Sequence, residues 1–91
     1  MFDFSGKAVL ITGASYGLGE QFAYAFADAG ADLILTARSS ELLEQVGETC
    51  RGKGRKVTVV TGDVSAEADV QNVIAAGIEA HGGIDVLINN A

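Results

Sequence analysis

Three glycines, Gly13, Gly17 and Gly19, follow the apolar run 8–11 and open a segment with helical periodicity. The first turn of a helix has unpaired N–H groups and a partial positive charge, which suit an anion, and glycine lets a backbone approach a diphosphate closely. The spacing G-x-x-x-G-x-G differs from the usual dinucleotide fingerprint, and no Lys-Ser/Thr pair follows as in a P-loop. The loop favours a nucleotide phosphate site over the alternative, a tight strand-to-helix turn that binds nothing.

The elements that must position this loop alternate between short β-type runs and helical periods. Near-continuous apolar strands joined by helices are typical of a parallel sheet covered on both faces, and right-handed crossovers make it doubly wound. We therefore expect one α/β domain over residues 1–91, a Rossmann-type three-layer sandwich with strand order 3-2-1-4 that stops after its fourth strand. The expected strands span 7–12, 33–35, 57–60 and 86–88, and the expected helices span 18–29, about 41–51, and the segment between Ser65 and His81.

The helical periods also predict which side chains face the sheet and which residues cap the helices. Ser40 and Ser65 stand where the side chain of an N-cap residue would bind the first turns of the second and third helices. The expected inward face of the first helix comprises Leu18, Phe22, Ala25, Phe26 and Ala29. The expected apolar stripe of the third helix comprises Val70, Val73, Ile74, Gly77 and Ile78.

Composition and charge exclude several classes of function. A formal charge of −6 disfavours nonspecific binding to nucleic acid or to an anionic membrane. The chain has no signal-peptide pattern and no apolar run of transmembrane length, so a cytoplasmic location is expected. The single cysteine, Cys50, is expected on a buried helix face rather than as a reactive thiol. We interpret the basic cluster Arg51, Lys53, Arg55 and Lys56 as a solvated helix end, not a phosphate-binding patch.

Further unusual residues follow the later strands. Ligands of doubly wound sheets bind at the carboxyl ends of the strands, and here those ends carry Asp63-Val64 and Asn89-Asn90-Ala91. Together with Thr12-Gly-x-x-x-Gly17-x-Gly19, these motifs resemble the short-chain dehydrogenase/reductase family. The resemblance implies binding of NAD or NADP and interconversion of small alcohols and ketones by hydride transfer. It covers the whole chain but only the first part of the family fold, so we expect the N-terminal piece of a longer, dimeric or tetrameric enzyme.

The resemblance also implies roles for individual residues. Asp63 would accept a hydrogen bond from the adenine amino group, and Val64 would lie beside the ring. Asn90 and Ala91 would line the ribose site, whereas Asn89 would mainly connect neighbouring strands. The cofactor phosphates and the adenosine ribose would be held by the backbone of the loop Gly13, Ala14, Ser15, Tyr16, Gly17, Leu18 and Gly19.

The end of the second strand bears on the choice of cofactor. An acid there binds the ribose 2′-OH of NAD, whereas a nearby arginine accommodates the 2′-phosphate of NADP. This chain has Arg38 and Ser39 and no acid at that end, which favours NADP(H). A charge-assisted hydrogen bond of roughly 1.5–3 kcal/mol corresponds to about 10- to 100-fold. Tyr16, where NADP-binding members often have a second basic residue, tempers this preference, and pairing of Arg38 with Glu41 or Glu44 is the alternative.

No residue of this chain fits the family's catalytic acid, a tyrosine followed four positions later by lysine. Tyr16 is followed at that position by Glu20, and Tyr24 by Asp28. His81 is expected on the surface, at a helix end on the wrong side of the sheet. We therefore expect the chain alone to be catalytically inactive. Two alternatives remain open at this stage: a stand-alone nucleotide-binding or regulatory module, and a structural α/β domain that binds no nucleotide.

Overall fold

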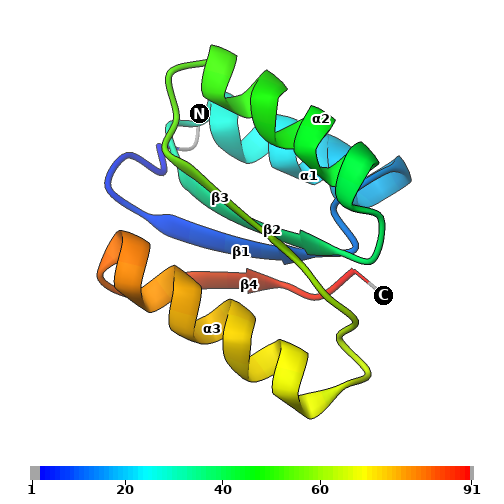
Figure 1. The fold of residues 1–91 in the computed structure, drawn as a ribbon. Helices are drawn as coiled ribbons and strands as arrows, with labels where there is room; N and C mark the ends of the chain where they lie inside the picture. Colours follow the sequence, from blue (N-terminus) through cyan, green and yellow to red (C-terminus); the bar gives the residue numbers. More distant parts are fainter. Residues whose placement is uncertain (1–2, 91) are drawn as a thin grey trace.

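A computed structural model describes residues 3–90, which form one four-stranded parallel sheet with helices on both faces (Figure 1). The strand order is β3-β2-β1-β4, as predicted. Helices α1 and α2 cover one face of the sheet and α3 covers the other, which gives the predicted three layers. The elements are β1 (Ala8–Thr12), α1 (Gly17–Asp28), β2 (Asp32–Ala37), α2 (Ser40–Gly52), β3 (Val57–Thr61), α3 (Glu67–His81) and β4 (Val86–Ile88).

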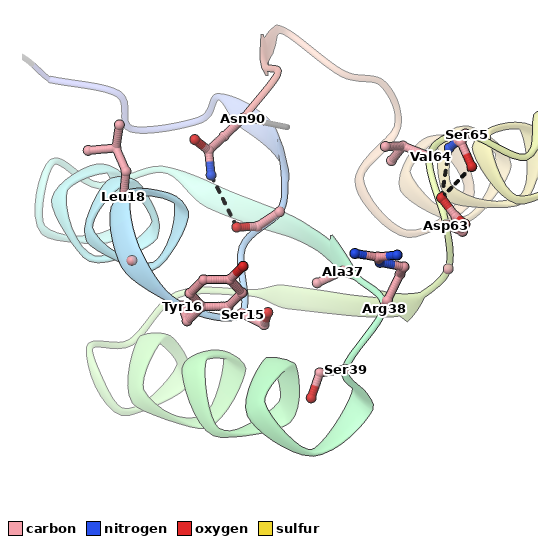
Figure 2. Close-up of a pocket in the computed structure, with 13 residues that line it drawn as sticks. Ser15, Tyr16, Leu18, Ala37, Arg38, Ser39, Asp63, Val64, Ser65 and Asn90 are labelled. Carbon is pink, nitrogen blue, oxygen red and sulfur yellow. Dashed lines mark hydrogen bonds between the residues drawn. The ribbon is translucent and has the colours of Figure 1, made fainter.

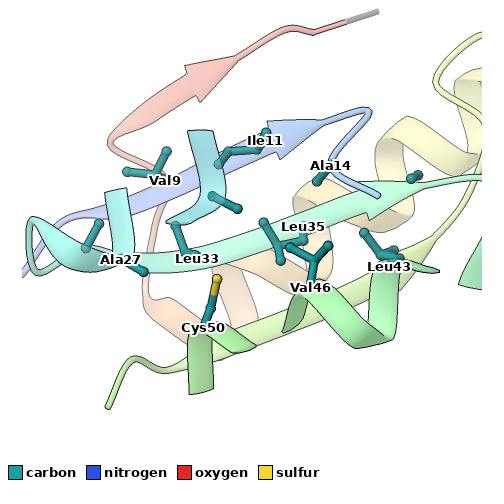
Figure 3. Packing of buried hydrophobic residues seen from close by; sticks show 12 residues of the cluster. Val9, Ile11, Ala14, Ala27, Leu33, Leu35, Leu43, Val46 and Cys50 are labelled. Carbon is teal, nitrogen blue, oxygen red and sulfur yellow. The ribbon is translucent and has the colours of Figure 1, made fainter. Parts of the chain in front are cut away.

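The two central strands are buried along almost their whole length because both faces of the sheet are covered. Alternate residues of β1 and β2 point to opposite faces and form two apolar clusters. The larger cluster lies under α1 and α2 (Figure 3) and contains Val9, Ile11, Leu33 and Leu35. The smaller cluster, which faces α3, contains Ala8, Leu10, Ile34 and Val73.

The inward face of α1 differs from the prediction. The buried residues are Gly19, Ala23 and Ala27, whereas Leu18 is 61% exposed. Phe22 and Phe26 pack against the edge of the larger cluster, as partly buried side chains. The helix is therefore rotated from the orientation that maximises apolar burial, because only small residues let its backbone lie this close to the sheet and to the glycine loop.

The predicted caps of α2 and α3 are also wrong. Ser39, not Ser40, occupies the N-cap position of α2, and Ala66, not Ser65, occupies that of α3; neither makes a side-chain cap hydrogen bond. The Ser65 hydroxyl instead donates to Asp63 Oδ1 at 2.7 Å. Gly82 ends α3 in the left-handed conformation, as expected of a helix C-cap. On α3, Val73 and Gly77 are buried but Ile74 and Ile78 are 40% and 51% exposed, so the predicted stripe faces the sheet only in part.

The basic cluster is anchored at the end of the sheet opposite the glycine loop. Arg51 pairs with Glu44 and Glu48 of its own helix, and Lys53 pairs with Asp28 at the end of α1. Arg55 donates to the Gly30 carbonyl, and Lys56 donates to the Ala80 carbonyl. These bonds connect the α2–β3 segment to the ends of α1 and α3, so its cations are held by the fold itself rather than simply solvated.

Cys50 is fully buried in the larger cluster, as predicted. Burial raises the pKa of its thiol to about 11, so the reactive thiolate is scarce at neutral pH. Among residues 3–90, no helix has both the length and the hydropathy that a membrane crossing requires.

His81 lies at the C-terminal end of α3, away from the glycine loop as predicted, but it is not a simple surface residue. Its Nε2 shares a hydrogen bond of 2.9 Å with the Thr58 hydroxyl. Its Nδ1 is buried and has no partner among the described residues. Burial, aided by the charge of Lys56 and opposed by that of Asp32, lowers the pKa of the ring below 6.5. The folded chain therefore favours neutral His81.

This preference predicts a pH-dependent stability. Because the folded pKa lies below the unfolded value of 6.5, the His81 contribution is complete above that pH and is lost as the pH falls through the folded pKa. The urea midpoint should decrease between pH 7.5 and 5.5. His81→Gln, which keeps a polar group near Thr58 but does not titrate, should flatten the decrease. Equal slopes for the two proteins would show that another group is responsible.

Candidate functional site

A cavity of about 540 Å³ lies at the carboxyl ends of the strands, between the loops that follow β1, β2 and β3 and the residue pair that follows β4 (Figure 2). The switch point of a doubly wound sheet predicts this position. Most of the residues proposed from sequence line it: Gly13, Ser15, Tyr16, Gly17, Leu18, Arg38, Ser39, Asp63, Val64 and Asn90. Ala37, Gly62 and Ser65 also line it, and their signal in the sequence was their position in these same loops.

Three proposed residues are not among those that line the cavity. Ala14 is fully buried in the larger cluster beneath the loop. Gly19 is buried on the inward face of α1. Ala91 lies outside the described residues.

Glycine is required at the three positions of the loop for different structural reasons. A Cβ at Gly13 would overlap the Asn90 carbonyl oxygen, and a Cβ at Gly19 would overlap the Gly13 carbonyl oxygen. Gly17, in contrast, has no atom within 4 Å of such a Cβ, although its φ of +60°, like the +61° of Gly13, favours glycine. Two glycines therefore let the chain approach itself, and only Gly17 presents open backbone to the cavity.

Helix α1 begins at the cavity with its donors available. Its N-cap residue, Tyr16, has an extended backbone and makes no side-chain cap hydrogen bond. Tyr16 is 71% exposed on the rim of the cavity. The first N–H groups of α1 and the positive end of its dipole are thus free to bind an anion.

The end of β4 is connected to the glycine loop through Thr12. The Thr12 hydroxyl accepts the Asn90 N–H at 2.9 Å and donates to Asn89 Oδ1 at 3.2 Å. The Asn90 side-chain amide donates to the Gly13 carbonyl at 3.2 Å. Asn89 thus links neighbouring strands, as expected, and Asn90 holds the start of the loop.

Arg38 follows β2 and is exposed on the wall of the cavity, between Ala37 and Ser39 (Figure 2). The alternative that it pairs with Glu41 or Glu44 is not seen in the described part of the chain, where Glu44 pairs with Arg51 at 2.8 Å. Its guanidinium keeps its full set of donors for a ligand, and such a planar group suits a phosphate.

Asp63 is preorganised as a carboxylate. Its Oδ1 accepts the Ser65 N–H at 2.9 Å and the Ser65 hydroxyl at 2.7 Å. These two hydrogen bonds, with a smaller contribution from the charge of Arg38, lower the pKa of Asp63 below its usual value. An ionised Asp63 at neutral pH is an acceptor for an N–H donor on a ligand.

Tyr24, the second tyrosine of the chain, is not among the residues that line the cavity. The Tyr24 hydroxyl donates to Glu20 at 2.7 Å, and burial together with this bond raises its pKa, which makes it a poorer acid. No group of three or more potential metal-ligating side chains occurs in residues 3–90. With the start of α1 and Arg38 on its wall, the cavity offers hydrogen-bond donors and positive charge to an anionic ligand.

Comparison with known proteins agrees with this geometry. A family profile described as "short chain dehydrogenase" matches residues 7–91. The chain belongs to the short-chain dehydrogenase/reductase family. Curated relatives and solved structures of this family match nearly all of this chain. The chain spans only about a third of their length.

One curated relative and two solved structures illustrate these matches. Glucose 1-dehydrogenase of Gluconobacter oxydans is 45% identical over 97% of this chain and 34% of its own length. L-Sorbose reductase of Gluconobacter frateurii, solved with NADPH and L-sorbose, has a TM-score of 0.95 at 36% identity over 99% of this chain and 35% of its own. A short-chain dehydrogenase/reductase of Burkholderia phymatum, solved with NAD, has a TM-score of 0.90 at 39% identity over 96% of this chain and 31% of its own.

Proposed function

We propose that the chain binds NADP(H) and forms the cofactor-binding part of a short-chain dehydrogenase/reductase. The observation that carries the proposal is the convergence on one cavity of a free helix N-terminus, an unpaired arginine and an ionised aspartate. The diphosphate would bind at the start of α1, where Gly17 leaves the backbone open. Asp63 would accept the adenine amino group beside Val64, and Asn90 would border the ribose.

The preference for NADP(H) over NAD(H) rests on Arg38 and Ser39. A 2′-phosphate in this cavity would meet the Arg38 guanidinium and the Ser39 hydroxyl, and the residues that line the cavity at the end of β2 include no acid to bind a 2′-OH. The solved relatives include one with NADPH and one with NAD, so the family alone does not decide between the cofactors.

For the whole protein we propose hydride transfer between the nicotinamide and a small alcohol or ketone. The bound cofactor would supply or accept the hydride, and this chain would hold and orient it. Because neither Tyr16 nor Tyr24 is followed four positions later by a lysine, as the family's catalytic tyrosine is, we propose that the chain alone has no turnover. A dimeric or tetrameric assembly and a cytoplasmic location are further proposals that follow from the family.

The alternative is a nucleotide-binding module that regulates without catalysis. The absence of a Tyr-x-x-x-Lys pair from this sequence favours it, whereas membership of an oxidoreductase family favours the enzyme. An assay of NADPH oxidation by the whole protein, with a panel of small ketones and sugars, separates the two, because this chain alone is expected to show no turnover in either case. Turnover with any substrate supports the enzyme, and tight NADPH binding without turnover supports the module.

The proposed cofactor is tested by titrating the protein with NADPH and NADH and following the fluorescence of the reduced nicotinamide. We expect the Kd for NADPH to be about 10- to 100-fold lower, since a hydrogen bond between charged groups contributes roughly 1.5–3 kcal/mol. Equal affinities would refute the NADP preference, and no binding of either cofactor would refute the proposed function.

A further inference from the structure

Asp69 lies behind the part of the cavity that we propose binds adenine, and its carboxylate contacts the backbone of Asp63. It is the third residue of α3, it is half-buried, and it is not among the residues that line the cavity. Its Oδ2 accepts the backbone N–H of Asp63 at 2.8 Å. Asp69 is therefore connected to the residue proposed to recognise adenine, although it does not face the ligand itself.

Besides the two local bonds that Ser65 donates to the Asp63 carboxylate, the segment between β3 and α3 has few other hydrogen bonds. The Gly62 N–H donates to the Ala37 carbonyl at 3.0 Å, and the Ala66 N–H donates to the Asp63 carbonyl at 2.9 Å. Ala66 occupies the N-cap position of α3 but has no side chain that could cap the helix. The Asp69 carboxylate instead reaches back from the first turn of α3, past the N-cap residue, and connects the loop to the helix.

Gly62 makes room for this carboxylate. A Cβ at Gly62 would lie 3.2 Å from the Asp69 Cβ, which is tighter than an ordinary contact. The absence of a side chain at position 62 lets Asp69 pack directly under the loop. The glycine and the aspartate therefore form one unit, and a change in either should move the other.

We infer that Asp69 is a positioning residue of the cofactor site: its bond to the Asp63 N–H fixes the backbone that aims the Asp63 carboxylate at adenine. The inference rests on the proposed binding of NADP(H). Without Asp69 the half-buried N–H would lack its acceptor, and the loop would rotate to find another. The Asp63 carboxylate would turn with the loop and would lose its alignment with the adenine amino group.

The test compares NADPH with its hypoxanthine analogue, in which a carbonyl oxygen replaces the adenine amino group. An aligned Asp63 carboxylate accepts from the amino group but repels the carbonyl, so the wild-type protein should prefer NADPH by about tenfold or more. Asp69→Ala should reduce that ratio to about 1–2, mainly through weaker binding of NADPH. Asp69→Asn, whose amide oxygen can still accept the Asp63 N–H, should restore most of the preference.

Glu67→Ala is the matched control. Glu67 lies in the same first turn of α3, carries the same charge, and interacts with Gln71 rather than with Asp63. Glu67→Ala should leave the preference for NADPH over its hypoxanthine analogue unchanged. A general effect of charge at the start of α3 would instead change this preference as much as Asp69→Ala does.

The outcomes separate this inference from the function on which it rests. If the wild-type protein binds neither dinucleotide, the proposed function is wrong. If the wild-type protein prefers adenine and Asp69→Ala keeps that preference, the positioning role is wrong. Should Asp69→Ala fail to fold, as judged by circular dichroism, Gly62→Ala disturbs the same contact from the other side. An unchanged ratio in Gly62→Ala would then also overturn the inference.

Discussion

Arg38→Asp should reverse the cofactor preference of the protein. The substitution removes the cation proposed to bind the 2′-phosphate and places a carboxylate where it repels that phosphate but can accept a ribose 2′-OH. The lost cation and the new repulsion both weaken the binding of NADPH. We therefore expect the Kd for NADPH to rise by about 100-fold or more, while the Kd for NADH falls or stays constant. Fluorescence titration of the wild-type protein and of Arg38→Asp with NADPH and NADH measures the change.

Arg51→Asp is the matched control for this experiment. It makes the same change of charge on α2, but Arg51 pairs with Glu44 and Glu48 at the opposite end of the sheet from the cavity. The ratio of its Kd for NADH to its Kd for NADPH should stay close to that of the wild-type protein, even if its free energy of unfolding decreases. If Arg38→Asp leaves the ratio unchanged, or if Arg51→Asp shifts it equally, Arg38 does not select the cofactor.

Gly19→Ala should damage the fold and the site together. The new methyl group would overlap the Gly13 carbonyl oxygen and lie 2.7 Å from the Asn90 side-chain nitrogen. Because the overlapped atom belongs to the backbone, relief requires α1 to move away from the loop, and we expect a loss of about 3 kcal/mol in the free energy of unfolding. For a chain of this size that corresponds to a decrease in Tm of roughly 12–24 °C. Thermal denaturation followed by circular dichroism measures it.

Two other glycine substitutions calibrate this result. Gly52→Ala, at the exposed end of α2 with open space around it, should keep or slightly raise Tm. Gly17→Ala also meets no atom, but its φ of +60° should cost about 1 kcal/mol while its methyl group obstructs the cavity. We therefore expect Gly17→Ala to lose cofactor affinity with little loss of stability. A Gly19→Ala protein with wild-type Tm would contradict the packing explanation.

The sheet and the position of the cavity follow from sequence because few physical rules determine them. Strands that are apolar at nearly every position must be covered on both faces, and the handedness of the crossovers then leaves the order β3-β2-β1-β4. Once that order is known, the loops of Gly13, Arg38 and Asp63 must meet at one edge. Most residues of the family motifs line that cavity, whereas Ala14 and Gly19 are buried beneath it.

Other features were not predictable because they depend on distances between elements. Periodicity placed the large side chains of α1 inward, whereas close packing selected Gly19, Ala23 and Ala27. Each predicted serine cap lay one position beyond or before the true N-cap residue. Asp69 gave no distinct signal, since an acid in a first helical turn is already explained by the helix dipole. Its hydrogen bond to the Asp63 backbone appears only when the loop is built.

The division among the three loop glycines has an evolutionary consequence. Gly13 and Gly19 are required by the chain's own backbone and by Asn90, so they would stay under selection in a descendant that had lost its cofactor. Gly17 faces open space, so in such a descendant only its φ of +60° would still favour glycine, and selection on it would be weaker than on the other two. The glycine pattern of this loop is therefore largely a record of how the domain folds. Its middle position is the one that the fold constrains least, through its backbone conformation alone.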